Sequence, residues 1–159
     1  MVRSPRRPRT ASRVAAVQAL FQSEQAQDNP EAVIDQFVRH RLGELPGTGG
    51  FEEGRVPDAE VPLFASIVRA AVAQQDTIDR MLAEALPVGW PLGRIDPVLR
   101  AVLRAGAAEL AMSSGAPAKV VINEYLDVAR GFFIGAEPGM ANAVLDRMAR
   151  LLRPAEFDR

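Results

Sequence analysis

The chain has 159 residues, a formal net charge of −1 at pH 7, 48% hydrophobic residues and no cysteine. This length and composition predict a single globular domain with a core of its own, and the missing cysteines exclude disulfides, thiolate metal sites and cysteine nucleophiles. No apolar segment approaches the roughly 18 residues of a membrane-spanning helix, and the basic N-terminus lacks the apolar stretch of a secretory signal, so we expect a cytoplasmic protein.

Positive charge is concentrated at the start of the chain. Five arginines precede the first carboxylate, Glu24, so the first 23 residues carry five positive charges while the remaining 136 carry a net charge of −6. These arginines are Arg3, Arg6, Arg7, Arg9 and Arg13. Arginine outnumbers lysine by 18 to one in this chain, so the clustering is more informative than the residue type. We interpret residues 1–9 as a basic disordered tail, which is either a solvated terminus or an arm that binds phosphate.

The next part of the chain has the periodicity of helices. Apolar residues recur three and four positions apart, and the alternation typical of half-buried strands is nearly absent. The pattern predicts a first helix from Thr10 or Ser12 to about residue 26. A second helix is predicted after Asn29, a good capping residue, with Pro30 in its first position. Residues 43–57 contain five glycines and two prolines, which favour a mobile loop.

The second half of the chain continues the helical pattern. A third helical stretch begins near Asp58 and either continues or breaks near Asp76. The next helix has Asp96 as its predicted cap and Gly106 on its apolar face, where we expect a close contact with a neighbouring helix. The last two helices are predicted over residues 119–133 and 138–152. The expected fold class is therefore all-α, with about seven helices around one core.

No residue pattern in the sequence supports catalysis or a bound cofactor. The one histidine, His40, lies between two arginines without a cluster of metal ligands near it in the sequence. The glycine-rich segment 47–54 lacks the preceding strand and the lysine of a phosphate-binding loop. Trp90, between a glycine and a proline, is interpreted as a plug over one end of the helix bundle.

Two polar features interrupt apolar helix faces. On a helical wheel Arg13 falls between Val17 and Leu20, close to the apolar sector, where it either pairs with an acid or reaches past the core edge toward a ligand. Asn123 and Glu124 interrupt a later apolar helix, and asparagine is unfavourable there because its side chain competes for backbone groups. We therefore interpret Asn123 and Glu124 as structural residues that form hydrogen bonds within the protein.

Three stretches of the sequence occur in an order and at a spacing found in one known family. They are RVAAVQALFQ at residues 13–22, LRAGAAELAMSSGAPAKVVINEYLDVAR at residues 103–130, and ANAVLDRM at residues 141–148. The most specific part is the Ile-Asn-Glu block at residues 122–124, which follows Pro117. Together these stretches resemble the NusB family of bacterial transcription antitermination factors over roughly residues 9–150.

The resemblance implies an all-helical fold of two small subdomains, here a NusB-like RNA-binding domain over residues 10–153, without catalysis, cofactor or metal. It implies that the chain binds single-stranded boxA RNA together with the ribosomal protein NusE. Such a complex acts indirectly on the RNA polymerase elongation complex and supports read-through in ribosomal RNA operons. Because some family members dimerise, a homodimer is a further implied partner.

The resemblance also assigns roles to individual residues. Cations hold the backbone of single-stranded RNA, and aromatic rings or guanidinium groups stack on its bases. The residues predicted to contact RNA are Arg6, Arg7, Arg9, Arg13, Gln18, Phe21 and Phe132. The residues predicted to have structural polar roles are Asn123, Glu124 and Asn142.

The chain departs from the family pattern at the start of its last helix. A lysine and a phenylalanine that are usual there are replaced by Gly139 and Met140, which removes a cation and a stacking ring. Two alternative functions stay open. One is an RNA-binding helical domain related to the N-terminus of a ribosomal RNA cytosine methyltransferase, and the other is a helical protein-interaction adaptor without RNA binding.

Overall fold

The computed structural model describes residues 8–40, 42, 59–112 and 114–157. These residues form seven α-helices and one short 3-10 helix, and none of their elements is a strand, which confirms the all-α prediction. The elements are α1 (Pro8–Ala26), α2 (Pro30–His40), α3 (Val61–Ala73), α4 (Gln75–Ala85), α5 (Pro97–Ala111), α6 (Ala118–Phe132), α7 (Glu137–Leu152) and η2 (Pro154–Glu156).

Two predicted segments fall wholly or largely outside the described residues. The loop predicted over residues 43–57 is one, and residues 1–7 of the predicted tail are the other. The last two residues of that predicted tail are helical, because α1 begins at Pro8 rather than at Thr10 or Ser12. Proline suits this position, since the first turn of a helix has no use for its missing N–H.

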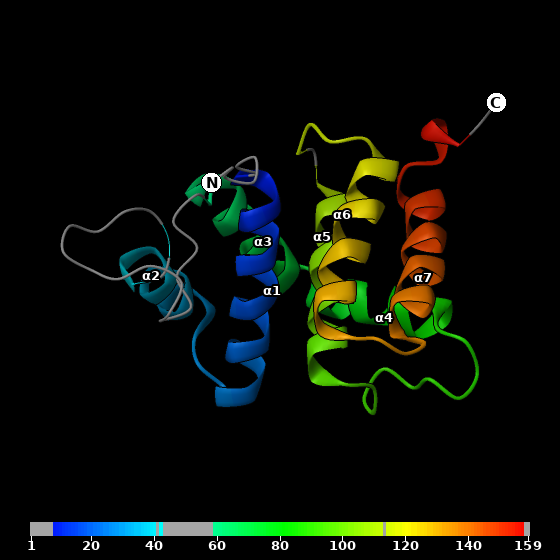
Figure 1. Cartoon of the computed structure of the whole chain (residues 1–159), viewed down its shortest axis with the longest axis horizontal. Helices are drawn as coiled ribbons and strands as arrows, with labels where there is room; N and C mark the ends of the chain where they lie inside the picture. The colour runs from blue at the N-terminus through cyan, green and yellow to red at the C-terminus, as the bar shows by residue number, and fades with distance from the viewer. Residues whose placement is uncertain (1–7, 41, 43–58, 113, 158–159) are drawn as a thin grey trace, which may run out of the picture.

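The helices form two groups on either side of the contact between α1 and α5. Figure 1 shows α1, α2 and α3 on one side and α5, α6 and α7 on the other, with α4 crossing behind the second group. Helix α5 contacts α1, α3, α4, α6 and α7. It is the central helix of the fold, and the core extends from it in both directions.

Small side chains allow α5 to be surrounded. Ten of its residues are buried, and half of these are alanine or glycine. At Gly106 a Cβ atom would lie 2.9 Å from Leu145 Cδ2 of α7 and 3.4 Å from Tyr125 Cγ of α6. The expectation of a close helix contact at Gly106 is therefore confirmed, and a larger residue there would have to displace the buried Leu145 side chain.

The predicted helix boundaries agree with the local hydrogen bonds. Asn29 Oδ1 accepts a hydrogen bond from the Glu31 backbone N–H at 2.8 Å, and Asp96 Oδ1 accepts one from Val98 N–H at 2.8 Å. Both side chains thus satisfy backbone donors that the first turn of a helix leaves free. Of the two alternatives for the third helical stretch, the structure has the break, since α3 ends at Ala73 and α4 begins at Gln75.

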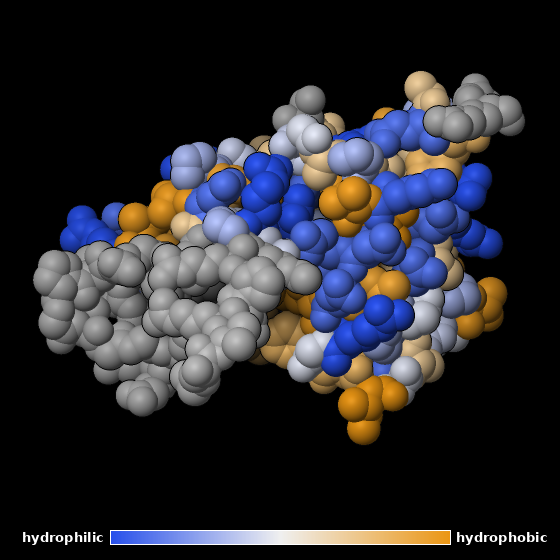
Figure 2. Space-filling view, turned by 45° about the horizontal axis from the view of Figure 1, so that its top comes forward, coloured by the Kyte–Doolittle hydropathy of each residue, from blue (hydrophilic) through white to orange (hydrophobic). Residues whose placement is uncertain are grey.

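Exposed hydrophobic side chains are scattered over the second group of helices and its loops. The larger ones are Val88, Val120, Phe132, Ile134 and Leu151. In Figure 2 the visible face of this group is mostly hydrophilic, with separate orange spots instead of one broad apolar patch. None of the helices in the described part of the chain has the length and hydropathy of a transmembrane span.

Candidate functional site

Arg13 lies at the centre of a polar cluster between α1, α5 and α6. Its Nε donates to Glu109 Oε1 at 2.7 Å and its Nη2 to Glu109 Oε2 at 2.6 Å. Its Nη1 donates to Glu124 Oε1 at 3.2 Å. A guanidinium and a carboxylate joined by two parallel hydrogen bonds are the strongest geometry available to such a pair.

The burial of Arg13 corrects one prediction. Only 1% of the residue is exposed, so its guanidinium has no open path to an RNA phosphate. Of the two alternatives that the sequence left open, the structure has Arg13 pair with an acid. The physical reason is that its wheel position between Val17 and Leu20 points it directly at α5, where Glu109 is buried.

Glu109 has a hydrogen-bond donor for each of its oxygens besides Arg13. The Tyr125 hydroxyl donates to Oε1 at 2.9 Å, and the Ser114 hydroxyl donates to Oε2 at 3.0 Å. Burial alone raises the pKa of Glu109, but the hydrogen bonds and charge of Arg13, with the two hydroxyl donors, outweigh it and hold this pKa below its usual value. Glu109 is thus a buried carboxylate that stays ionised.

Tyr125 is affected in the opposite direction by the same neighbours. Its burial, reinforced by the negative charge and hydrogen bond of Glu109, raises the pKa of the phenol well above its usual value. The phenol therefore stays protonated and acts as a donor to the carboxylate.

The cluster continues outward to the first turn of α1. The Thr10 hydroxyl donates to both oxygens of Glu124, at 3.0 Å and 2.9 Å. Arg9 Nη2 donates to the Ser114 carbonyl oxygen at 2.7 Å, and Arg9 Nη1 lies 3.5 Å from Glu60 Oε2. The side chain of Arg9 is nevertheless 43% exposed. The start of α1 is therefore tied to α6 and to the two connections that precede α3 and α6.

Arg153 fixes the connection that carries Ser114. Its guanidinium donates to the backbone carbonyl oxygens of Glu109, Leu110 and Met112, which cap the C-terminal end of α5, and to that of Ala116. A cation at this position also complements the negative end of the helix dipole. Sequence analysis missed this role, because the cap comes from a residue more than 40 positions away.

A second polar cluster joins the other end of α1 to α4 and α5. Glu24 accepts hydrogen bonds from Arg100 and Arg104, and Arg104 also pairs with Asp79 at 2.8 Å. The hydrogen bond and charge of Arg100, together with Arg104, lower the pKa of Glu24 below its usual value. Because Arg13 near the start of α1 meets the end of α5 and Glu24 near the end of α1 meets its start, the two helices run antiparallel with a register set at both ends.

Three of the other predicted RNA contacts are side chains of α1 and α6 that are not fully buried. Gln18 and Phe21 are half-buried on the strip of α1 that also contains Val14. Gln18 Oε1 is buried without a hydrogen-bond partner. Phe132 ends α6 with 47% of its surface exposed. Arg6 and Arg7 lie outside the described residues.

The three predicted structural polar residues differ in their surroundings. Glu124 has the internal hydrogen bonds that its assigned role requires. Asn123 and Asn142 are both exposed, which corrects the expectation that Asn123 forms internal hydrogen bonds. The buried face of α6 runs through Val121, Ile122 and Tyr125, and the 100° turn per residue sends Asn123 to the opposite side.

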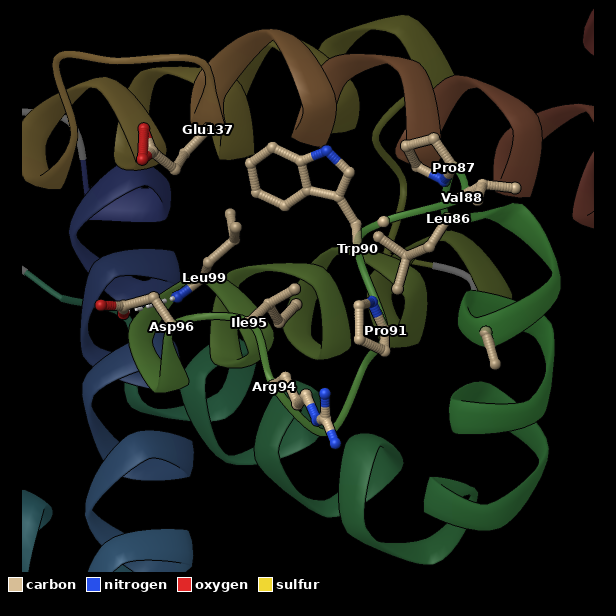
Figure 3. A pocket seen from close by; sticks show the side chains of 12 residues that line it. Leu86, Pro87, Val88, Trp90, Pro91, Arg94, Ile95, Asp96, Leu99 and Glu137 are labelled. Atoms are coloured by element: carbon tan, nitrogen blue, oxygen red, sulfur yellow. Dashed lines mark hydrogen bonds between the residues drawn. The ribbon is translucent and has the colours of Figure 1, made fainter.

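An open pocket of about 880 Å³ lies at the end of the bundle near Trp90. Figure 3 shows the Trp90 indole projecting into it between Pro87 and Glu137, with Arg94 turned away. The half-buried indole packs against the core, as a plug over the bundle end does. No group of acidic or histidine side chains among the described residues could hold a metal ion.

Comparisons with known proteins identify the family. The family model described as "NusB family" matches residues 10–150. The transcription antitermination protein NusB of Granulibacter bethesdensis is 70% identical over 151 residues, which cover 95% of this chain and 93% of the relative. The NusB protein of Gluconobacter oxydans is 52% identical over 145 residues, covering 91% of this chain and 88% of that protein.

Solved structures share the fold. A structure of T. maritima NusB superposes with a TM-score of 0.73 at 24% identity, covering 96% of this chain and 99% of the other. A crystal structure described as antitermination factors NusB and NusE in complex with dsRNA gives a TM-score of 0.69 at 18% identity, with 89% of this chain and 96% of the other covered. The chain belongs to the NusB family of transcription antitermination proteins.

Proposed function

We propose that this chain binds single-stranded, boxA-like RNA together with the ribosomal protein NusE, and that it supports read-through by RNA polymerase in ribosomal RNA operons in the cytoplasm. The main support for the proposal is the uneven distribution of charge along this chain, which belongs to the NusB family. Five arginines precede the first acid, while the rest of the chain has a net charge of −6. An acidic body repels RNA, so a local positive field has to supply the attraction.

A related complex supports the choice of partners. The crystal structure with a TM-score of 0.69 is described as NusB and NusE with dsRNA, so a protein of this fold has been seen with NusE and with double-stranded RNA. The two relatives described above are named as transcription antitermination proteins, and this chain aligns with 93% and 88% of their lengths. This favours an antitermination factor over the helical domain of a methyltransferase.

The described residues suggest which arginines stabilise the fold and which contact phosphate. Arg13 builds the fold, so phosphate contacts fall to Arg6, Arg7 and Arg9. Arg9 is the one of these three in the described part of the chain, and 43% of its side chain is exposed. Its contacts with the Ser114 carbonyl and with Glu60 are at the surface, where a phosphate can compete for the same guanidinium.

The strip of α1 beside this arm supplies groups that suit bases. Val14, Gln18 and Phe21 recur at four and three positions and so share one side of the helix. Phe21 offers a ring for stacking. Gln18 is half-buried on this strip, and a side-chain amide can both donate to and accept from a base edge. Phe132, which is exposed at the end of α6, is the second ring in the proposed surface.

A binding measurement with purified components tests the proposal. A labelled single-stranded boxA-like RNA is titrated with this chain, with NusE, and with both, alongside a scrambled RNA of the same composition. The proposal expects the pair to bind the boxA-like RNA more tightly than either protein alone and more tightly than the scrambled RNA. Binding to NusE without any RNA affinity supports the adaptor instead.

A further inference from the structure

The contact between Glu124 and Thr10 ties the start of α1 to α6 without being needed to neutralise Arg13. Glu109 is fully buried and already meets Arg13 through two hydrogen bonds. Glu124 is a second carboxylate beside the same cation, and its side chain is 23% exposed at the rim of the cluster. Its two short contacts come instead from the Thr10 hydroxyl, one turn before Arg13.

These contacts restrain the part of the helix that is most prone to fray. The first turn of a helix lacks the backbone hydrogen bonds that hold later turns together. Here Thr10 is held by Glu124, and Ser12 Oγ both donates to the Glu60 carbonyl oxygen at 3.0 Å and accepts from the Glu60 N–H at 2.6 Å. The first turn of α1, which contains Arg9, is thus held from two sides, by α6 and by the residue before α3.

We propose that Glu124 is a positioning residue for RNA binding, which acts through Thr10 to hold the first turn of α1, and with it Arg9, in place. This inference rests on the proposed RNA-binding function. A cation on a fraying helix end samples many directions, and each phosphate contact then carries an ordering cost. A cation at the end of a fixed turn avoids most of that cost.

The negative charge of Glu124 should weaken RNA binding, whereas its hydrogen bond with Thr10 should strengthen it. The two effects can therefore be measured separately. Arg9 and Arg13 carry two positive charges at the root of the arm, while Glu60, Glu109 and Glu124 carry three negative charges. The surplus acid repels RNA, so a purely electrostatic Glu124 would weaken binding. A positioning Glu124 strengthens it in spite of its charge.

Three variants exploit that difference. Glu124→Gln removes the charge but keeps a side-chain oxygen that accepts from Thr10, and we expect affinity equal to or slightly above that of the parent. Thr10→Val keeps the charge and the shape but removes the donor, and Glu124→Ala removes the acceptor. For each of these two we expect affinity to fall about three- to tenfold, the equivalent of one lost hydrogen bond.

A matched control lies at the other end of the same helix. Ser23→Ala removes a side-chain hydroxyl that donates to the Asp28 backbone carbonyl oxygen, a local contact that does not involve α6. We expect its RNA affinity to equal that of the parent. All variants are checked for the parent's melting temperature and helical circular dichroism, so that a loss of folded protein is recognised as such.

The decisive experiment combines RNA affinity with hydrogen exchange. Thr10→Val and Glu124→Ala should bind the labelled boxA-like RNA more weakly in the presence of NusE and should exchange the amides of residues 9–12 faster, while exchange in α5 stays unchanged. Glu124→Gln should restore both readouts. If the parent binds RNA and all three variants bind equally well, the positioning role is wrong while the proposed function stands. If Glu124→Gln is as weak as Glu124→Ala, an oxygen that accepts from Thr10 does not suffice, and the positioning role is wrong. If both Glu124 variants bind RNA more tightly than the parent, the effect of Glu124 is electrostatic. If the parent itself binds no RNA, the proposed function is wrong.

Discussion

Arg13 of α1 and Glu109 of α5 stand 96 residues apart in the sequence and meet through two hydrogen bonds inside the protein. Both are essentially excluded from solvent. Such a pair is costly to bury, and it is tolerated when every polar atom has a partner. Tyr125, Ser114 and Glu124 supply the remaining partners here. The pair joins the two groups of helices at one point of their contact.

Removing the charge of Glu109 should therefore destabilise the protein strongly. Glu109→Gln leaves the Arg13 guanidinium buried without a full counter-charge, and we expect the free energy of unfolding to fall by about 3 kcal/mol or more. Urea denaturation followed by circular dichroism measures this. The control is Asp35→Asn, which breaks the exposed Asp35–Arg39 pair within α2 and should cost less than about 0.5 kcal/mol. Equal midpoints for the two variants would contradict the account.

Acid should weaken the fold through the same carboxylate. The pKa of Glu109 lies below its usual value in the folded protein, so near pH 4 the unfolded chain binds more protons at this site than the folded one. The stabilisation is therefore complete above the ordinary glutamate pKa and is lost as the pH falls through the lowered folded value. Between pH 7 and pH 4 the parent should lose more unfolding free energy than Glu109→Gln, as urea titrations at each pH would reveal. If the parent and Glu109→Gln lose the same unfolding free energy, Glu109 is not the cause of the acid sensitivity.

Alkaline titration can follow Tyr125 directly, because it is the one tyrosine of the chain. Burial and the charge of Glu109 raise the pKa of its phenol well above the usual value. Since the folded pKa is the raised one, this contribution to stability is present below the ordinary phenol pKa and is lost as the pH rises above it. The ultraviolet absorbance change of tyrosinate should appear together with the loss of helical circular dichroism. Ionisation near pH 10 in a protein that stays helical would show that the phenol is accessible.

Asn123→Ala should have little effect on stability. Asn123 is exposed on α6, so no buried partner loses a hydrogen bond, and alanine is the better helix former by a few tenths of a kcal/mol. Thermal melts should place the variant within about 0.5 kcal/mol of the parent. A loss above 1 kcal/mol would mean that the side chain has a structural partner after all.

The elements that sequence analysis predicted well have local causes. Asn29 and Asp96 cap helices within three residues of themselves, so the sequence alone contains both partners of each hydrogen bond. Gly106 correctly predicted a close contact between helices, because glycine is otherwise unfavourable in a helix.

The polar clusters have partners that are far apart in the sequence, and here prediction was weaker. The helical wheel located Arg13 near the apolar sector, yet nothing local identified Glu109 as its partner. Asn123 was misassigned because its apolar neighbours in the sequence, Ile122 and Tyr125, point to a different side of α6. Only the packed arrangement of the helices decides such questions.

Replacing Phe21 should weaken RNA binding in a different way from replacing the N-terminal arginines. Only the loss of the arginines should change how strongly the affinity depends on salt. Phe21→Ala removes a stacking ring and no charge, so affinity should fall by roughly 1–3 kcal/mol with nearly unchanged salt dependence. Phe21 also packs against the core, so the variant's melting temperature has to be recorded beside its affinity. A marked change in its salt dependence would mean that the ring orders the arginines instead of stacking on a base.

The most direct test of the account is the salt dependence of RNA binding when Arg6, Arg7 and Arg9 are changed together to alanine. For a single strand, each phosphate neutralised contributes about −0.7 to the slope of log affinity against log salt concentration. Titrations of the boxA-like RNA at several salt concentrations, with NusE present, should therefore show a slope about 2 units flatter for the triple variant than for the parent. Because phosphate contacts carry no sequence information, affinity for the scrambled RNA should fall to a similar extent. A triple variant with the affinity and slope of the parent would contradict the central claim that the arginine-rich N-terminus holds RNA.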